Sequence, residues 1–385
     1  MAKLPGLLSI AMFTALIAQA GTLSLLDAAQ IGLPAGARAP DFSLPDQAGQ
    51  SRDFGSLAGT RGLILVFFRS ADWCIYCKSQ LIQLQRDYAA LKRSGYGLAA
   101  ISYDSREVLA EFAARKRIEF PLLADHESNV IRAFGVANRE FRKGMQVDVQ
   151  TEKVYLSSLD NVPVYGIAYP AVFVMAADHS VAWRFVSESA ELRLTGSAIL
   201  ERAVGAKIEA YRNAQAGTSI VKVATVAGTD SAALGSRLTV AVEISMPQGF
   251  HVYSPDAGKE YRRLNWRMNR SQCWVMGEAI YPEGHRRTFS FSEAPLPVYE
   301  GTIRLTRELI VQPAIRAGDS SVYELFRKTC LDAQDKVGAA GVLEMQSCDE
   351  RQCYPPRSIP LAWKFKFIAP DRQRSPAELR REFEP

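Results

Sequence analysis

The residues with the clearest chemistry in this sequence are two close pairs of cysteines. Cys74 and Cys77 are separated by two residues, and Cys348 and Cys353 by four. Cysteines this close together can form and break a disulfide with little movement of the backbone. Each pair is therefore a candidate for thiol–disulfide exchange, in which one thiolate attacks a disulfide and its neighbour releases the product.

The first pair stands where a buried strand gives way to a helix. The continuous apolar run at 63–68 predicts a strand that is buried on both faces. Beyond Cys77, apolar residues recur at spacings of three and four as far as Gly95, which predicts an amphipathic helix. The unpaired N–H groups and the dipole of a helix start favour a thiolate at Cys74. We therefore expect Cys74 to attack and Cys77, one turn deeper, to resolve the mixed disulfide.

Strands and helices continue to alternate after this helix. Further strands are expected at 97–103, 121–124, 171–175 and 181–186, and further helices after Asp104, at 130–134 and at 197–212. The order β-α-β-α-β-β-α predicts a thioredoxin-type α/β domain spanning 38–212, with residues 136–168 as an insertion.

The second half of the chain has a different periodicity. Alternating apolar residues around 238–244, 303–311 and 361–367 predict strands of an all-β sandwich domain spanning 237–370. The small and polar segment 213–236 is expected to be a linker into this domain. Residues 371–385 are expected to form a charged tail.

Residues 38–212 resemble the thioredoxin-like redoxin superfamily, which includes the AhpC/TSA-related proteins. The segments that carry the resemblance are APDFSL at 39–44, FFRSADWCIYCKSQL at 67–81 and YPAVFV at 169–174. The resemblance implies that Pro170 follows a cis peptide bond and packs beside the reactive cysteines. The residues themselves suggest that Trp73 either packs in the core or, because it stands beside Cys74, shapes a docking face. They also suggest that Asp72 either caps the helix or is solvated.

Two positions depart from that superfamily. Its peroxidases carry a Pro-x-x-x-Thr/Ser-x-x-Cys motif, but counting back from Cys74 gives Ala71 and Phe67, and from Cys77 gives Cys74 and Ser70. Thioredoxins also often place a carboxylate six residues before the first cysteine, where Phe68 stands here. Peroxidase activity is therefore the alternative rather than the leading expectation.

Residues 220–368 resemble the N-terminal periplasmic domain of the bacterial thiol:disulfide interchange protein DsbD. The resemblance rests on the Cys-x4-Cys-Tyr-Pro-Pro segment that begins at Cys348 and on the stretch 281–301. It implies an immunoglobulin-like sandwich in which Phe289 shields the cysteine pair until a partner docks. Arg286 and Arg287 occupy a loop that is acidic in the better-known relatives. An inert structural disulfide is the alternative for this pair.

The remaining candidate ligands do not predict a metal or cofactor site. Zinc needs four ligands, usually in two clusters. The four histidines are scattered, and we expect them at the surface or in loops: His126, His179, His251 and His285. The spacing of Cys273 and Cys330 leaves open whether they pair. Redox-active cysteine pairs are the only redox groups expected.

The length, the net charge and the N-terminal residues indicate the domain number, the class of partner and the compartment of this protein. A chain of 385 residues predicts two domains, and a net charge of +5 without a dense basic run argues against a nucleic-acid partner. Residues 1–20 combine Lys3, an apolar run and Ala18-Gln19-Ala20, as in a cleaved signal peptide. We expect a periplasmic or secreted protein, or an N-terminally anchored one if the segment is retained. Exported cysteines commonly pair or exchange disulfides.

The sequence therefore predicts an exported thiol–disulfide oxidoreductase that acts on thiols and disulfides of exported proteins. Electrons would pass between the two cysteine pairs within the chain or through a third protein. A thiol-dependent peroxidase reacting through Cys74 is one alternative. A second is a non-catalytic adaptor whose Cys-x-x-Cys holds copper(I) through soft thiolates.

Overall fold

The computed structural model describes residue 28 and residues 30–140, 146–148, 154–155, 161–204, 211–218, 220–292, 294–312 and 320–380. The expected signal peptide lies outside these residues. Among the helices that are described, none combines the length and the apolar character needed to cross a membrane.

The first half of the chain is built on a mixed sheet. Its strands are β3 (Gly62–Phe67), β4 (Tyr96–Ser102), β5 (Leu122–Ala124), β9 (Ala171–Ala176) and β10 (Val181–Val186). β9 runs antiparallel between β3 and β10, and β4 pairs in parallel with β5. The N–H of Phe68 donates to the carbonyl of Ile101 at 3.0 Å, which joins the β3 side of the sheet to β4.

Helices surround this sheet, and those after β3 follow the predicted order, whereas the short helix at 54–57 was not expected. They are α1 (Phe54–Leu57), α2 (Ile75–Arg93), α3 (Arg106–Lys116) and α4 (Asn129–Ala133). Short strands complete this half: β1 (Leu44–Pro45) and β2 (Ser51–Arg52), and within the expected insertion β6 (Gln146–Asp148), β7 (Val154–Tyr155) and β8 (Asn161–Pro163). The thioredoxin-like α/β expectation is confirmed for this half. We call it the redoxin half.

Two expectations at the end of the redoxin half are wrong. The helix expected at 197–212 is described as α5 (Gly196–Ile199) and a π-helical turn, η1 (Leu200–Val204), but residues 211–212 belong to a strand. The expected linker instead contributes β12 (Tyr211–Gly217) and β13 (Lys222–Ala227), which pair antiparallel. Val223 and Val226 are buried within a segment of small residues, and this burial stabilises strands where the composition suggested a linker.

The second half consists mostly of strands in several sheets. The first sheet has the order β12-β13-β15-β21-β18, with β15 (Ser236–Ser245), β21 (Thr302–Val311) and β18 (Trp274–Ile280). The second has the order β14-β24-β22-β17, with β14 (Ser231–Ala232), β24 (Arg357–Phe367), β22 (Lys336–Met345) and β17 (Asn265–Met268). Trp274 contacts Phe365 across the two sheets, with ring centroids 5.5 Å apart. The β-rich expectation is confirmed.

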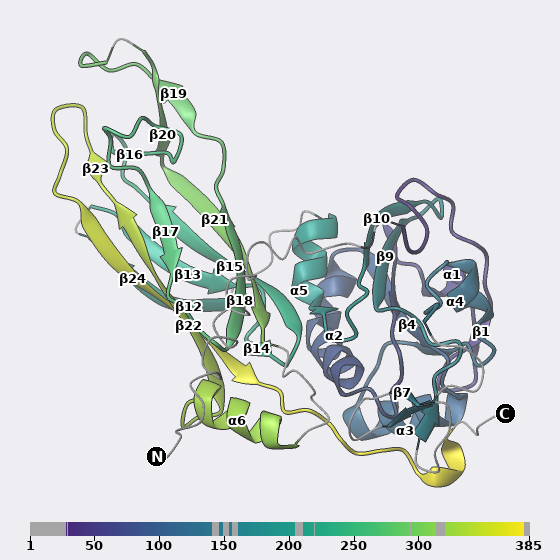
Figure 1. Cartoon of the computed structure of the whole chain (residues 1–385). Coiled ribbons are helices and arrows are strands. Elements are labelled where there is room, and N and C mark those ends of the chain that lie inside the picture. Colours follow the sequence, from purple (N-terminus) through teal and green to yellow (C-terminus); the bar gives the residue numbers. More distant parts are fainter. Residues whose placement is uncertain are drawn as a thin grey trace, which may run out of the picture.

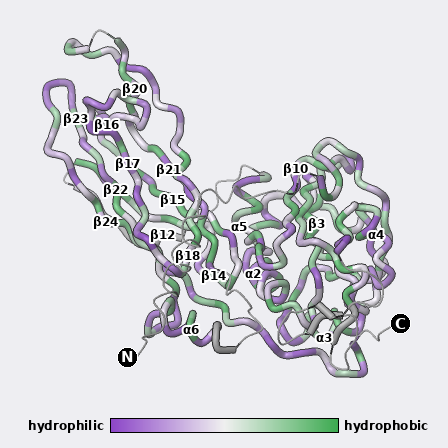
Figure 2. Tube along the Cα trace, viewed as in Figure 1, coloured by the Kyte–Doolittle hydropathy of each residue, from purple (hydrophilic) through white to green (hydrophobic). Residues whose placement is uncertain are grey.

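A third, smaller sheet lies at one end of the β-rich half. Its order is β19-β20-β16-β23, with β19 (His285–Arg287), β20 (Leu296–Glu300), β16 (His251–Tyr253) and β23 (Ser347–Cys348). Figure 1 shows this sheet at the end that points away from the redoxin half, whereas α6 (Ser320–Cys330) lies at the opposite end. Figure 2 shows hydrophobic stretches along β3 and a hydrophilic turn beside β23.

The two halves contact each other along β15. β11 (Arg193–Leu194), which belongs to the redoxin half by sequence, pairs in parallel with residues 236–237 of β15. Gln83 of α2 accepts a hydrogen bond from the Ser236 hydroxyl at 2.8 Å. Because Arg193 of β11 also contacts the sulfurs of Cys74 and Cys77, the β-rich half lies close to the first cysteine pair.

Candidate active sites

The first cysteine pair lies at the start of α2, as the spacing predicts. Cys74 is the N-cap residue, and its Sγ accepts a hydrogen bond from the N–H of Cys77 at 3.2 Å. The two residues form a disulfide with their Cα atoms 5.3 Å apart. After reduction, this N–H donor and the helix dipole would stabilise a thiolate on Cys74.

A buried arginine contacts both sulfurs. Nη2 of Arg193 lies 3.2 Å from Sγ of Cys77 and 3.7 Å from Sγ of Cys74. Arg193 is only 2% exposed. Because a guanidinium stays charged in proteins, it favours whichever sulfur carries the negative charge. Sequence reasoning missed Arg193, which is separated from Cys77 by 116 positions and lies in no motif.

The polypeptide covers this disulfide on all sides. Cys74 is 2% exposed and Cys77 is fully buried. From the β-rich half, Gly235 approaches so closely that a Cβ atom on it would lie 3.2 Å from the ring of Tyr76. A protein disulfide therefore reaches Cys74 only after part of this cover moves.

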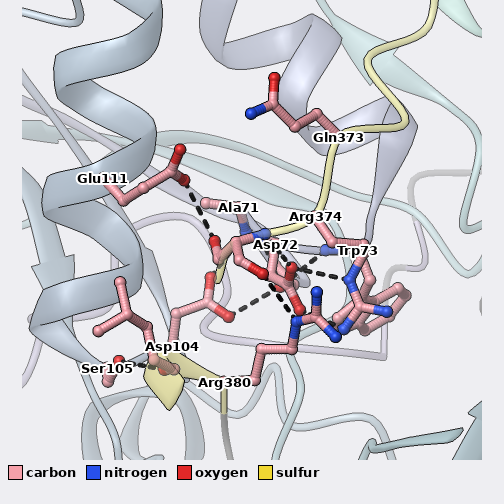
Figure 3. A network of polar contacts seen from close by, with 12 residues as sticks. Ala71, Asp72, Trp73, Asp104, Ser105, Glu111, Gln373, Arg374 and Arg380 are labelled. Atoms are coloured by element: carbon pink, nitrogen blue, oxygen red, sulfur yellow. Dashed lines mark hydrogen bonds and ion pairs between the residues drawn. The ribbon is translucent and has the colours of Figure 1, made fainter. Parts of the chain in front are cut away.

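The C-terminal residues contribute to the cover. Residues 371–380, which we call the C-terminal strap, return from the β-rich half to the redoxin half (Figure 1). Nε of Arg374 donates to Oδ1 of Asp72 at 2.7 Å, and the N–H of Ser375 donates to the same oxygen at 2.8 Å (Figure 3). The expectation of a tail is wrong for these residues. Asp72 is buried, and a buried carboxylate requires a cation and hydrogen-bond donors, which the strap supplies.

Lys78 links the strap to α2. Its Nζ donates to the backbone carbonyls of Asp72 and Gln373, both at 2.9 Å. Burial lowers the pKa of Lys78 to about 8, although the negative charges of Asp371 and Asp72 oppose the shift. The start of α2 therefore carries a buried amine one turn beyond Cys74.

The loop before Cys74 is held by a buried carboxylate. Asp104 accepts hydrogen bonds from the Ser70 hydroxyl at 2.8 Å, the Ala71 N–H at 2.7 Å and the Ser102 hydroxyl at 2.8 Å. Burial raises the pKa of Asp104 to about 6 against the effect of these donors. Asp104 thereby fixes the path of the chain between β3 and α2.

The structure differs from the expectations for two residues near the first pair, Trp73 and Pro170. Trp73 is 5% exposed and donates from Nε1 to the hydroxyl of Tyr103 at 2.9 Å, so it forms no exposed docking face in this structure. No peptide bond among the described residues is cis, so the expectation of a cis bond before Pro170 is wrong. Pro170 leads directly into β9, and its carbonyl accepts from the N–H of Ser187 at 2.9 Å. The trans isomer is also the commoner one for a peptide bond before proline.

The second pair lies in the hairpin that follows β22. Cys348 and Cys353 form a disulfide with their Cα atoms 4.0 Å apart. Cys348 is 1% exposed, whereas Cys353 is exposed. Asp349 shapes the turn by accepting from the N–H groups of Arg351 and Gln352 at 2.7 and 2.8 Å. An incoming thiolate can therefore approach Cys353 but not Cys348.

Aromatic residues cover the buried side of this disulfide. Cys348 belongs to a small apolar cluster together with Tyr253, Ala257, Phe289, Leu296 and Val298. Phe289 is 9% exposed and packs 4.8 Å from the ring of His251. His251 is 1% exposed, so the expectation of a surface or loop position is wrong for it. Its place inside β16, opposite Cys348, explains the burial.

The third pair is structural by position. Cys273, next to β18, forms a disulfide with Cys330 at the end of α6, with Cα atoms 5.6 Å apart. The structure thus resolves the pairing that spacing left open. Within the described ranges, no group of three or more His, Cys, Asp and Glu side chains is arranged to hold a metal ion.

A sheet of thioredoxin-like order, with a Cys-x-x-Cys disulfide at the start of the following helix, defines a thiol-dependent oxidoreductase. Comparison with known proteins narrows this class to one family, because residues 35–184 match the AhpC/TSA family. Peroxiredoxin Bcp of Escherichia coli (strain K12) is 34% identical over 116 residues, which make up 30% of this chain and 73% of that protein.

Further relatives carry similar names. A putative peroxiredoxin of Mycobacterium tuberculosis is 30% identical over 115 residues, covering 30% of this chain and 72% of that protein. Among solved structures, peroxidoxin BcpB from Mycobacterium tuberculosis is 23% identical, covers 42% of this chain and 88% of its own, and has a TM-score of 0.33. Through residues 35–184, this chain belongs to the AhpC/TSA family.

Proposed function

We propose that this protein is a thiol–disulfide oxidoreductase that exchanges disulfides with protein partners through Cys74 and Cys77. The observation that carries the proposal is the disulfide at the N-cap of α2, with Arg193 in contact with both sulfurs. Two cysteines one helical turn apart suit rapid closure of a mixed disulfide. The Thr or Ser that would precede a peroxidatic cysteine by three positions is absent before Cys74 and Cys77.

Cys348 and Cys353 are proposed as a second exchange pair. The exposed position of Cys353 suits attack by or on a partner, and the aromatic cover over Cys348 suits protection of the resolving thiol. These features support the resemblance to the N-terminal domain of DsbD and its immunoglobulin-like sandwich. They also support a shielding role for Phe289, which packs in the same cluster as Cys348.

A thiol-dependent peroxidase is the second candidate. It is favoured by the relatives, since the Escherichia coli and Mycobacterium tuberculosis proteins are named as peroxiredoxins. In that case Cys74 or Cys77 would attack a hydroperoxide, and the other cysteine would close the disulfide seen here.

One set of assays separates the two candidates. The intact protein and its Cys74→Ser, Cys77→Ser and Cys348→Ser variants are tested for reduction of insulin disulfides and for consumption of hydrogen peroxide, both with a thiol reductant. Disulfide exchange predicts insulin reduction that Cys74→Ser abolishes, and mixed disulfides trapped by Cys77→Ser. Peroxide consumption at a rate well above insulin reduction would replace the leading proposal with the peroxidase.

Export is proposed from the character of residues 1–20, with partners among exported proteins. The test is the N-terminal sequence of protein recovered from the periplasm or medium of an expressing bacterium. Cleavage after Ala20 supports a signal peptide, an intact membrane-bound form supports an anchor, and an intact cytosolic form contradicts export.

A further inference from the structure

His251 is a buried titratable residue that the exchange chemistry described so far does not use. It is the register partner of Cys348 in the antiparallel pairing of β16 with β23. Directly opposed residues in such a pair extend their side chains from the same face of the sheet. The imidazole is therefore on the side of the sheet that holds the sulfur of Cys348, beneath Phe289.

The ring nitrogens of His251 are buried and have no hydrogen-bond partner among the described residues. The whole residue is 1% exposed. A buried polar group without a partner costs free energy, and such groups are found where chemistry needs them. Its neighbours are aromatic: Phe289 at 4.8 Å and Tyr253 at 5.5 Å between ring centroids.

Charged groups on the neighbouring strands and turn affect the pKa of His251. Burial is the largest cause that lowers its pKa, and the positive charge of Arg287 on β19 acts in the same direction. Glu300 on β20 and Asp349 after β23 oppose the shift, and His285 on β19 adds to it. The imidazole is therefore neutral at neutral pH and free to accept a proton.

We propose that His251 is the proton acceptor for the buried thiol of Cys348. This inference rests on the proposed exchange function of the second pair. In the reduced protein, the thiolate of Cys353 attacks a partner disulfide, forms a mixed disulfide and releases one partner thiolate. His251 then takes the proton of Cys348, whose thiolate attacks Cys353 and restores the Cys348–Cys353 disulfide. The second partner thiolate leaves and is protonated by the imidazolium, so two electrons pass to the partner.

The test follows the two steps separately in the full chain carrying Cys74→Ser and Cys77→Ser. Reaction of the reduced protein with the neutral disulfide dithiodipyridine releases one thiopyridone when Cys353 attacks and a second when Cys348 resolves. With His251 present, the rate of the second release should level off above the lowered pKa of the imidazole. In His251→Phe and His251→Gln it should fall by roughly a hundredfold at neutral pH and keep rising towards the pKa of a free thiol.

The control is His126→Gln, which removes an exposed histidine of the redoxin half and should keep the plateau. Thermal unfolding identifies any variant that fails to fold, and the two replacements differ enough that one is expected to fold. An unchanged pH profile in a folded His251 variant overturns the inference. Absence of the first release in the parent protein would instead contradict the exchange function of Cys353.

A second, independent observation concerns the partner. A groove of about 870 Å³ is lined by Tyr261, which packs on the cluster around Cys348, and by Arg357, four positions after Cys353. Its other charged lining residues are Lys259, Glu260, Arg262, Arg263 and Glu344. The carboxylate of Glu344 is bound by Arg267 and Asn265, which leaves Glu260 against four cations.

We infer that this groove binds an acidic segment of the polypeptide whose disulfide reacts at Cys353. The inference deepens the proposed function by naming the charge of its partner. A charged surface beside a reactive group raises the rate of encounter with partners of opposite charge and lowers the rate for partners of like charge.

Two cyclic peptides of equal length test this, one with glutamates and one with lysines flanking the disulfide. The acidic peptide should react faster, and salt should reduce its advantage. The charge reversal Arg262→Glu with Arg263→Glu should reduce the ratio of the acidic to the basic peptide's rate by roughly tenfold or more. The matched control, Lys336→Glu with Lys366→Glu, reverses two charges at the other end of the sheet that contains Arg357 and should leave this ratio unchanged. Equal rates for both peptides overturn the groove inference, whereas failure of dithiodipyridine to react contradicts the exchange function itself.

Discussion

At the scale of single residues, the guanidinium of Arg193 is a buried positive charge in contact with both sulfurs of the Cys74–Cys77 pair. Its Nη2 lies within 3.7 Å of both. We expect Arg193→Met to raise the pKa of the reduced Cys74–Cys77 pair by about one unit, which corresponds to roughly 1.4 kcal/mol of lost stabilisation of the thiolate. The measurement is the rate of alkylation of each cysteine against pH, read by mass spectrometry.

Two variants control this experiment. Arg193→Lys keeps the positive charge and should retain most of the effect. Arg106→Met removes an exposed arginine of the redoxin half and should leave the thiol pKa unchanged. If Arg193→Met folds and its cysteines titrate as in the parent protein, Arg193 has only a packing role.

At the scale of elements, the C-terminal strap binds Asp72, two residues before Cys74. The carboxylate of Asp72 is 6% exposed and pairs with Arg374. Removing one partner of a buried ion pair typically costs roughly 3–5 kcal/mol. We therefore expect Arg374→Gln to release the strap and to accelerate reduction of the Cys74–Cys77 disulfide by small thiols about tenfold. Arg372→Gln changes an exposed neighbour in the same strap and should have little effect.

Strap docking should also depend on pH through Asp371. Burial alone would raise its pKa, but hydrogen bonds from Arg115 and Lys116 and the charge of Lys78 lower it to about 2. A folded-state pKa below the unfolded value means that the stabilisation is complete above about pH 4 and is lost as the pH falls towards 2. Hydrogen exchange of residues 371–380, corrected for intrinsic rates, should rise over this range. In Asp371→Asn the exchange should be faster at pH 5 and no longer change with pH.

The elements that could be predicted are those with a strong local pattern. The buried run of β3 and the apolar spacing of α2 place Cys74 at a helix start without any tertiary information. β12 and β13 were missed because small residues mask their alternation. The contacts of Arg193 and Arg374 were missed because they join residues far apart in the sequence, 302 positions in the case of Asp72 and Arg374. Long-range charge pairing leaves no local signal in one sequence.

At the scale of the whole molecule, the Cys74–Cys77 and Cys348–Cys353 pairs lie far apart. Figure 1 shows β23 at the end of the β-rich half that points away from α2 and the redoxin half. We therefore expect transfer between the pairs to use a second molecule or a third protein. A chain carrying Cys77→Ser and Cys348→Ser leaves one thiol at each site. Mild oxidation should give disulfide-linked dimers, and an intramolecular link between Cys74 and Cys353 would contradict this arrangement.

The β-rich half also pairs with β11, which carries the Arg193 that contacts both sulfurs of the first pair. Glu308 of β21 binds Arg237 of β15, with Nη2 of Arg237 2.6 Å from Oε2, and also binds Arg202 of η1 in the redoxin half. The side chains of Arg237 and Glu308 are 3% and 8% exposed. Glu308→Gln would leave a buried arginine without its carboxylate, at a typical cost of roughly 3–5 kcal/mol. Because η1 and β11 follow each other closely along the chain, this change should loosen the contact that covers Cys74 and Cys77.

The expected result is a faster reduction of Cys74–Cys77 by a small thiol, although the substitution lies in the other half of the molecule. Reduction of Cys348–Cys353 serves as an internal reference and should be unchanged, because that pair lies at the far end of the β-rich half. Glu344→Gln removes an exposed ion pair with Arg267 and should alter neither rate, since such pairs contribute about 0–1 kcal/mol. If Glu308→Gln lowers the unfolding temperature but accelerates both reductions equally, the effect is global destabilisation, and the β-rich half is not a specific cover for the first site.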